Sequence, residues 1–328
     1  MIYILLFFSC VCSSLGAYSI VFIHLGPVLP DYLPVAIEQA RLFNRECPIY
    51  LVGNQAAFDK APSFVDESVQ CVPSETLLRS VSHEQFCIRS TLDRSSFEGF
   101  WTYTSERFFC LEELIRQFAL TDVFHLENDV MLYADLGQLL PVFQRSYGGK
   151  IGATFDNETR CIPGFVYISE ITPIASLVQL MAEKAETAIN DMYMLQEFKN
   201  RYGDRYIKNL PIIAPEYGQE FPLTNALGET TNDPDGYSLH FDAFQSIFDA
   251  AALGQYLGGI SPRNGGGALG FINESCLFNP GLLSFIWKED PQGRQVPFIQ
   301  GKGGAYRVNN LHIHSKNLPL FFSKRIEE

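Results

Sequence analysis

The sequence predicts an α/β fold, a single Rossmann-like domain with a mostly parallel central sheet flanked by helices. Short runs of apolar residues alternate along the chain with segments of helical periodicity, which is the pattern expected of strands that helices bury on both faces. No linker and no internal repeat interrupts this alternation. Turn-rich stretches become frequent beyond Pro215, so we expect the C-terminal third of the chain to be irregular.

The predicted strands are short apolar runs that end at glycine or polar residues. The first covers residues 19–25 and stops at Gly26, as is typical of a parallel strand buried on both faces. Further strands are predicted at residues 49–52, 68–72, 123–126, 151–155 and 164–168. Ligands on such sheets bind at the carboxyl ends of the strands, so the end of the strand at 123–126 is where we look for a site.

Helices are predicted where apolar residues recur every three or four positions. These segments are residues 34–43, 105–120, 171–183 and 191–202. Ser105 is of a type that caps helices, and Asn190 or Asp191 stands where the last of these helices should begin.

The composition favours a globular protein with a sizeable core. Of 328 residues, 47% are hydrophobic and 19% charged, whereas ordinary globular chains carry about 25% charged residues. This balance excludes disorder and coiled coils. The net charge of −13 argues against nucleic acid, or an anionic membrane surface, as a partner held by bulk electrostatics. An anionic ligand would therefore need a local device, such as a metal ion or a few basic side chains.

The N-terminus has the pattern of a secretory signal. Residues 2–11 form an apolar run that small residues follow up to Ala17. We interpret residues 1–17 as a signal peptide, which predicts that the domain over residues 18–328 enters the secretory route or is exported. A membrane anchor is the less favoured alternative, and an apolar extension packed on the fold is the other. Membrane association is expected only through this segment.

Six cysteines remain after the predicted signal peptide and are spread over the chain. They include no Cys-x-x-Cys pair and no zinc-finger spacing, so the sequence does not predict a structural zinc site of that kind. Six exported cysteines permit many disulfide pairings, and their spacing selects none of them.

An acidic pair follows the predicted strand at residues 123–126. Glu127 and Asp129 stand two residues apart, so in an extended chain their side chains project to the same face. Two neighbouring carboxylates repel each other unless a proton or a cation lies between them, and Mg²⁺ and Mn²⁺ prefer oxygen ligands. The alternative is a polar turn after a strand. The similar triplet Asp233-Pro234-Asp235 is interpreted as such a turn.

A predicted helix followed by a strand that ends in Glu127-Asn128-Asp129 resembles the nucleotide-sugar half of glycosyltransferases with the GT-A fold. Residues 20–26 are similar to the first nucleotide-binding strand of that family, and residues 51–54 to its second. The likeness extends from about residue 19 to residue 316. It departs from the family at Glu127, where Asp is commonest.

The resemblance implies an enzyme that moves a sugar from a nucleotide diphosphate sugar, specifically a UDP-sugar, to a glycan, lipid or protein acceptor. It implies a donor half over residues 18–156 and an acceptor half over residues 157–328. It also implies a divalent cation, Mn²⁺ or Mg²⁺.

The implied metal ligands are Glu127 and Asp129 with a late histidine. His314 is the first choice for that histidine and His312 the alternative, since the two stand two apart in an extended segment. Lys316 follows and would neutralise the diphosphate. A structural pair of histidines in a strand is the other interpretation.

Further residues are implied on the donor and acceptor sides. Donor contacts are expected from His24, Gly26, Arg107, Glu127, Asn128 and Lys316. Asp191 or Asp249 would be the acceptor-side base if the reaction inverts the sugar, and no such base is needed if it retains. Each of these residues also has a purely structural interpretation. Asp191 would then be an acid at the start of a helix, Asp249 would lie within a packed core helix, and Arg107 would be an exposed residue of its helix.

Two other functions remain open at this point. One is a non-catalytic sugar- or nucleotide-binding protein of the same fold, which would tolerate alanine at Glu127 and Asp129. The other is a metal-dependent phosphoesterase, which would release phosphate without an acceptor. The sequence contains no Gly-x-Ser-x-Gly or His-Glu-x-x-His motif, which argues against hydrolases that use them. Its Gly-x-Gly-x-x-Gly string at residues 265–270 follows no predicted strand, so it does not indicate the dinucleotide-binding turn of a dehydrogenase.

Overall fold

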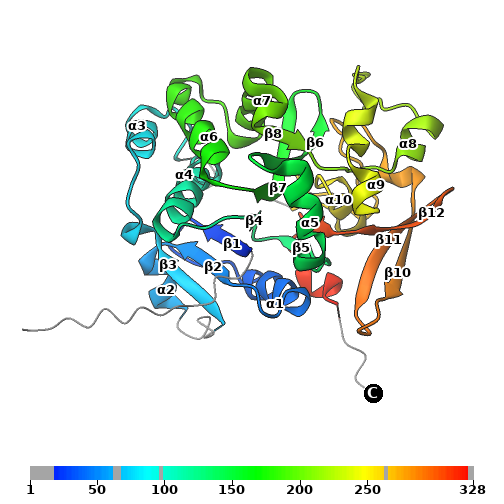
Figure 1. Cartoon of the computed structure of the whole chain (residues 1–328), viewed down its shortest axis with the longest axis horizontal. Helices are drawn as coiled ribbons and strands as arrows, with labels where there is room; N and C mark the ends of the chain where they lie inside the picture. Colours follow the sequence, from blue (N-terminus) through cyan, green and yellow to red (C-terminus); the bar gives the residue numbers. More distant parts are fainter. Residues whose placement is uncertain (1–17, 62–67, 96–98, 262–264, 324–328) are drawn as a thin grey trace, which may run out of the picture.

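The structure is a computed structural model, described here over residues 18–61, 68–95, 99–261 and 265–323. Its centre is a seven-stranded sheet in the order β3-β2-β1-β4-β7-β6-β8 (Figure 1). The strands are β1 (Ser19–His24), β2 (Ile49–Gly53), β3 (Val69–Pro73), β4 (Val123–Leu126), β6 (Ile151–Asn157), β7 (Arg160–Ile168) and β8 (Ile207–Asn209). Only β7 runs against its neighbours in this sheet. The predicted α/β fold with a mostly parallel sheet is confirmed.

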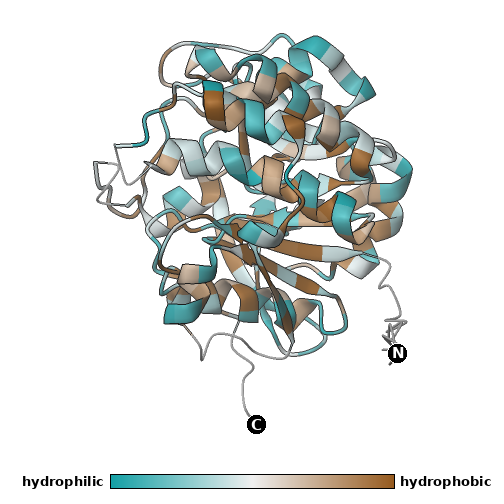
Figure 2. Ribbon diagram, turned by 90° about the vertical axis from the view of Figure 1, so that its left-hand side faces the viewer, coloured by the Kyte–Doolittle hydropathy of each residue, from teal (hydrophilic) through white to brown (hydrophobic). Residues whose placement is uncertain are grey.

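Helices cover both faces of the sheet because successive residues of each strand point to opposite sides. Ile20 and Phe22 of β1 join a core with α1 (Leu33–Phe43) and α5 (Leu136–Tyr147). Val21 and Ile23, on the opposite face of β1, join a second core that four further helices cover. Those helices are α3 (Val81–Arg89), α4 (Phe100–Phe118), α6 (Ile171–Glu183) and α7 (Asp191–Tyr202). Figure 2 shows the strands as a largely hydrophobic layer between helices of mixed hydropathy.

The C-terminal third holds short elements and a second sheet that the sequence analysis did not predict. A four-stranded sheet has the order β10-β11-β12-β9, and β13 pairs separately with β5. Their bounds are β5 (Val130–Leu132), β9 (Ser246–Ile247), β10 (Ser284–Glu289), β11 (Gln295–Gly301), β12 (Gly304–Val308) and β13 (Asn310–His312). The short helices of this part are α8 (Pro215–Glu220), α9 (Phe241–Phe244) and α10 (Ala252–Gly258). Another short helix, α2 (Gln55–Lys60), follows β2 in the N-terminal part. The expected division between residues 156 and 157 falls inside β6.

Of the four predicted helices, only α4 departs from its predicted bounds by more than one residue, whereas α3 and α5 were not predicted. The bounds of α6 and α7 are those predicted, and the Asn190 side chain caps α7 by accepting from the Tyr193 N–H. The α4 helix begins at Phe100, so Ser105 lies buried inside it and the prediction that Ser105 is the cap is wrong. Within the described residues, no helix combines the length and apolarity needed to cross a membrane. The predicted signal peptide at residues 1–17 lies outside them.

The strand order creates a natural place for a ligand. From β1 the chain passes through α1 to β2 on one side, while β4 lies on the other side of β1. In open α/β sheets, ligands bind in the crevice beyond the carboxyl ends of strands where the order reverses in this way. The carboxyl ends of β1 and β4, at His24 and Leu126, meet at that point.

Candidate functional site

The acidic motif lies between the central sheet and the C-terminal elements. Glu127 follows β4, and its N–H donates to the carbonyl of Gly164 in β7 at 2.9 Å. The chain then turns, because the Val130 N–H donates back to the Glu127 carbonyl at 3.0 Å. Next, β5 pairs antiparallel with β13, and the Asp129 carbonyl accepts from the Ile313 N–H at 2.9 Å. The motif is thus held at both ends by backbone hydrogen bonds.

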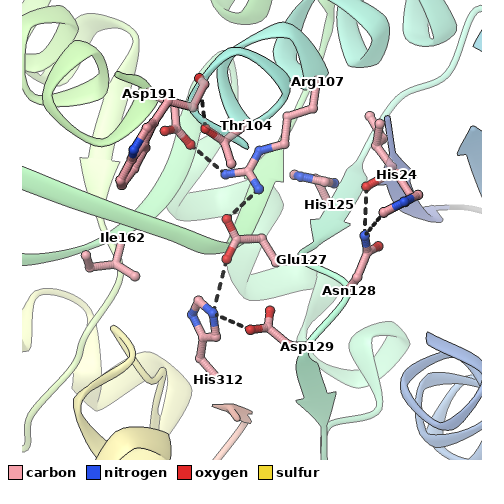
Figure 3. Close-up of polar contacts among 12 residues, drawn as sticks. His24, Thr104, Arg107, His125, Glu127, Asn128, Asp129, Ile162, Asp191 and His312 are labelled. Atoms are coloured by element: carbon pink, nitrogen blue, oxygen red, sulfur yellow. Dashed lines mark hydrogen bonds and ion pairs between the residues drawn. The ribbon is translucent and has the colours of Figure 1, made fainter. Parts of the chain in front are cut away.

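The pairing of β5 with β13 brings His312 to the two carboxylates. His312 lies opposite Val130, and its Nε2 is 3.1 Å from Asp129 Oδ2 and 3.2 Å from Glu127 Oε2 (Figure 3). One ligand atom from each of the three side chains lies within 4.8 Å of the others. Two carboxylates and an imidazole supply the oxygen and nitrogen donors that hold divalent cations, so the residues present fit a divalent cation.

His314, the first choice from the sequence, does not reach this group. The extended segment ends with β13 at His312, and the chain turns so that the His314 N–H donates to the His312 carbonyl at 3.0 Å. Because the chain turns there, the side chains of His312 and His314 do not project to the same face as they would in an extended strand. His314 Nδ1 instead accepts from the Ser261 N–H at 3.2 Å. Burial, with His312 and Lys316 nearby, lowers the pKa of His314 to about 4 and keeps its ring neutral. The alternative, His312, is the histidine that the structure brings to Glu127 and Asp129.

Basic side chains alternate with the acidic ones across the site. Lys316 Nζ pairs with Asp129 Oδ2. Arg107, on α4, pairs through one nitrogen with Glu127 and through the other with Asp191 Oδ2 at 2.8 Å. Arg107 is only 6% exposed, so it is not the exposed helical residue of the alternative interpretation. The resulting series, drawn as far as Asp129 in Figure 3, is Asp191, Arg107, Glu127, His312, Asp129 and Lys316.

The pKa values of the site follow from burial and this pairing. Burial opposes ionisation of Glu127, but Arg107 and His312 outweigh it and hold the pKa of Glu127 below its usual range. The pKa of Asp129 is lowered in the same way, with His312 and Lys316 outweighing burial. Asp191 differs, because burial exceeds the effect of Arg107 and raises its pKa. Glu127 and Asp129 are therefore held ionised, and the same two carboxylates outweigh burial and raise the pKa of His312, so a bound cation would take the place of a proton on its ring.

Asn128 connects the motif to the end of β1. Its Nδ2 donates to the Ile23 carbonyl at 3.1 Å and to His24 Nδ1 at 3.3 Å. Its Oδ1 is buried and has no hydrogen-bond partner among the described residues. In the next loop, the Gly26 N–H donates to Asn54 Oδ1 at 2.7 Å, and a Cβ at Gly26 would lie 3.1 Å from His24 Nε2. His24, Gly26 and Asn128 thus all lie where the carboxyl ends of β1 and β4 meet.

Asp249 has a structural position that the sequence analysis did not anticipate. It is fully buried just before α10, where its Oδ1 accepts from the Leu253 N–H at 2.9 Å. Its Oδ2 accepts from the Gly254 N–H at 2.8 Å and from the His312 N–H at 3.0 Å. Both oxygens are therefore occupied by backbone donors. This geometry corrects the assignment of Asp249 as a base and makes it a clamp between α10 and β13.

Two features of the site were missed from the sequence. The contact between Arg107 and Asp191 joins residues 84 positions apart, and no local pattern signals it. The pairing of β5 with β13 had a signal, because Val130, Met131 and Leu132 are a short apolar run directly after the motif.

The sequence matches no known protein-family model and no curated protein. Among solved structures, the galactosyltransferase LgtC with donor and acceptor sugar analogues is 13% identical, with a TM-score of 0.43 over 67% of this chain and 82% of that one. Mouse xyloside xylosyltransferase 1 in its apo form is 10% identical, with a TM-score of 0.42 over 59% of this chain and 85% of that one. A cytidylyltransferase from Leptospira borgpetersenii is 11% identical, with a TM-score of 0.38 over 60% and 76%. Such low TM-scores do not establish an activity.

Proposed function

We propose that this protein is a metal-dependent glycosyltransferase that uses a nucleotide diphosphate sugar, specifically a UDP-sugar. The observation that carries the proposal is the group formed by Glu127, Asp129 and His312 at the carboxyl ends of β1 and β4. A divalent cation fits these residues, and Lys316 lies directly beside Asp129. A cation with a neighbouring lysine is what a net-acidic protein needs to hold a diphosphate.

The proposed chemistry is electrostatic stabilisation of a leaving diphosphate. A bound Mn²⁺ or Mg²⁺ would supply positive charge against the departing nucleoside diphosphate. Lys316, 35% exposed at its side chain, would exchange its pairing with Asp129 for the phosphate oxygens. Arg107 pairs with both Glu127 and Asp191 and holds the two carboxylates in place. Asp191 remains the candidate acceptor-side base, because burial raises its pKa and so strengthens it as a base.

The donor would bind along the ends of β1, β2 and β4. His24, Gly26 and Asn128 lie where the ends of β1 and β4 meet. The buried Asn128 Oδ1, which has no hydrogen-bond partner among the described residues, would accept from a ligand N–H or O–H. The acceptor, which we propose to be a glycan, lipid or protein, would come from the side of residues 157–328. We further propose that the domain acts in the secretory route or outside the cell, since residues 1–17 have the pattern of a signal peptide.

Thermal unfolding with a panel of nucleotide sugars tests the donor site. Each sugar nucleotide is added with Mn²⁺ and then with EDTA, to the wild type and to Asp129→Ala. At about 100 times its dissociation constant, a bound donor adds about 2.7 kcal/mol of stability. We expect such a shift for a UDP-sugar, dependent on Mn²⁺ and absent in Asp129→Ala. Asp235→Ala is the matched control, because Asp235 is the exposed last residue of the other acidic triplet.

Turnover then separates the three functions. Release of the nucleoside diphosphate, accelerated by an acceptor, supports the transferase. Release of inorganic phosphate without an acceptor indicates a phosphoesterase, and a shift without turnover indicates a binding protein. If no sugar nucleotide shifts the unfolding temperature in the presence of Mn²⁺, the proposal is wrong.

A further inference from the structure

A second group of metal-ligating side chains lies between α3 and α4. His83 and Cys87 are four residues apart on α3, so they share one face of that helix. Glu106 faces them from α4. A ring nitrogen of His83, the Cys87 Sγ and a Glu106 oxygen all lie within 4.8 Å of one another. This group and the one at Glu127 are the two such clusters in the described part of the chain.

The spacing of these atoms is close to that of a tetrahedral site. His83 Nε2 is 3.1 Å from Glu106 Oε1, and Cys87 Sγ is 3.8 Å from the same oxygen. Zinc binds nitrogen, oxygen and sulfur at about 2.0–2.3 Å, which places neighbouring ligand atoms of a tetrahedron about 3.3–3.8 Å apart. Small movements of the Glu106 side chain, which is 18% exposed, would bring the three atoms to such distances.

Glu113 orients the histidine as the outer partner of a metal ligand does. Its Oε1 accepts from the Ser80 N–H at 2.7 Å and lies 2.9 Å from His83 Nδ1. When Nδ1–H donates to Glu113, Nε2 presents its lone pair toward Cys87 and Glu106. Histidines that bind metals commonly donate their other ring N–H to a carboxylate in this way. The ring is further fixed by stacking on Phe109, with 5.1 Å between ring centroids.

We propose that His83, Cys87 and Glu106 bind a zinc ion that fastens α3 to α4. A thiolate and an imidazole together select zinc over Mg²⁺ or Mn²⁺, whereas the group at Glu127, Asp129 and His312 contains no sulfur. Three protein ligands leave the fourth position to water. Cys87 and Glu106 are only partly buried, so an ion can enter from solvent. This site does not depend on the function proposed above.

Cobalt substitution of the full-length chain tests the proposal, because a Co²⁺–thiolate bond gives a near-ultraviolet charge-transfer band that the other group cannot produce. We expect this band and one tightly bound equivalent of Zn²⁺ in the wild type. Both should persist in Asp129→Asn, which disables the other metal group. Cys87→Ser should abolish the band, while Cys71→Ser, which changes a half-buried cysteine on β3, should leave it intact.

Glu113→Gln provides a second test that does not remove a ligand. Loss of an outer carboxylate partner commonly lowers metal affinity by about 10–100-fold, so Zn²⁺ binding should weaken to that extent while the band remains. The proposal is overturned if the wild type gives no thiolate band, or if Cys87→Ser keeps the band and the Zn²⁺. The cluster would then be a buried ion pair of protonated His83 with Glu106 and Glu113.

Discussion

Replacing Asp249 by alanine tests whether this carboxylate is a structural clamp. Its oxygens accept three buried backbone N–H groups at 2.8–3.0 Å. Each buried donor left without an acceptor costs about 1–3 kcal/mol, so the loss of all three costs about 3–9 kcal/mol. Burial raises the pKa of Asp249, so the ionised group itself carries a desolvation cost that the substitution removes. We expect a net loss of about 3–6 kcal/mol, a large part of the roughly 5–15 kcal/mol that stabilises a domain.

Urea unfolding followed by circular dichroism measures this loss. Asp249→Asn keeps one carbonyl oxygen and the side-chain volume, so it should lose about half as much as Asp249→Ala. Asp242→Ala removes an exposed carboxylate of α9 and should change stability by less than about 0.5 kcal/mol. An Asp249→Ala protein with wild-type stability but no donor turnover would refute the clamp and restore Asp249 as a catalytic base.

Three further substitutions test the site itself. His312→Ala removes a proposed ligand, so in calorimetry it should weaken Mn²⁺ binding by more than the roughly 10–100-fold that loss of an outer partner costs. His314→Ala should leave Mn²⁺ binding nearly unchanged, and equal effects of the two substitutions would contradict the assignment. Lys316→Ala removes a cation that pairs with Asp129, so Mn²⁺ should bind more tightly and a UDP-sugar more weakly. If both affinities change in the same direction, Lys316 does not exchange Asp129 for the phosphate oxygens. Arg107→Gln removes the cation that pairs with the buried Asp191 and with Glu127, although Glu127 keeps its contact with His312. The substitution should cost about 3–5 kcal/mol in urea unfolding, and a loss below about 1 kcal/mol would show that the two carboxylates do not depend on Arg107.

The central sheet could be predicted because its strands and helices are specified by local patterns. The apolar runs at residues 19–25 and 123–126 correspond to β1 and β4, and the helical periodicity gave the bounds of α6 and α7 correctly. The acidic motif was found for the same reason, since Glu127 and Asp129 follow a buried strand directly. Each of these features depends on neighbours in the sequence.

The features that were not predicted depend on distant contacts. Whether His312 or His314 meets the carboxylates is decided by where β13 stops, which depends on its pairing with β5. The hydrogen bonds of Asp249 likewise require α10 and β13 to be packed together. The start of α4 was placed late because Ser105 is a good capping residue, yet in this helix it is buried. Tertiary packing overrides local preference in each case.

The pairing of β5 with β13 has a consequence for how the molecule matures. His312 and Asp129 are 183 residues apart in sequence, and β13 is held to α10 by Asp249. A nascent chain can assemble β1 to β4 and their helices long before His312 has been synthesised. Contacts of such wide sequence separation form late because the loop they close costs entropy first. We therefore expect metal affinity to appear after most of the secondary structure during refolding, so that Mn²⁺ binding reports complete folding.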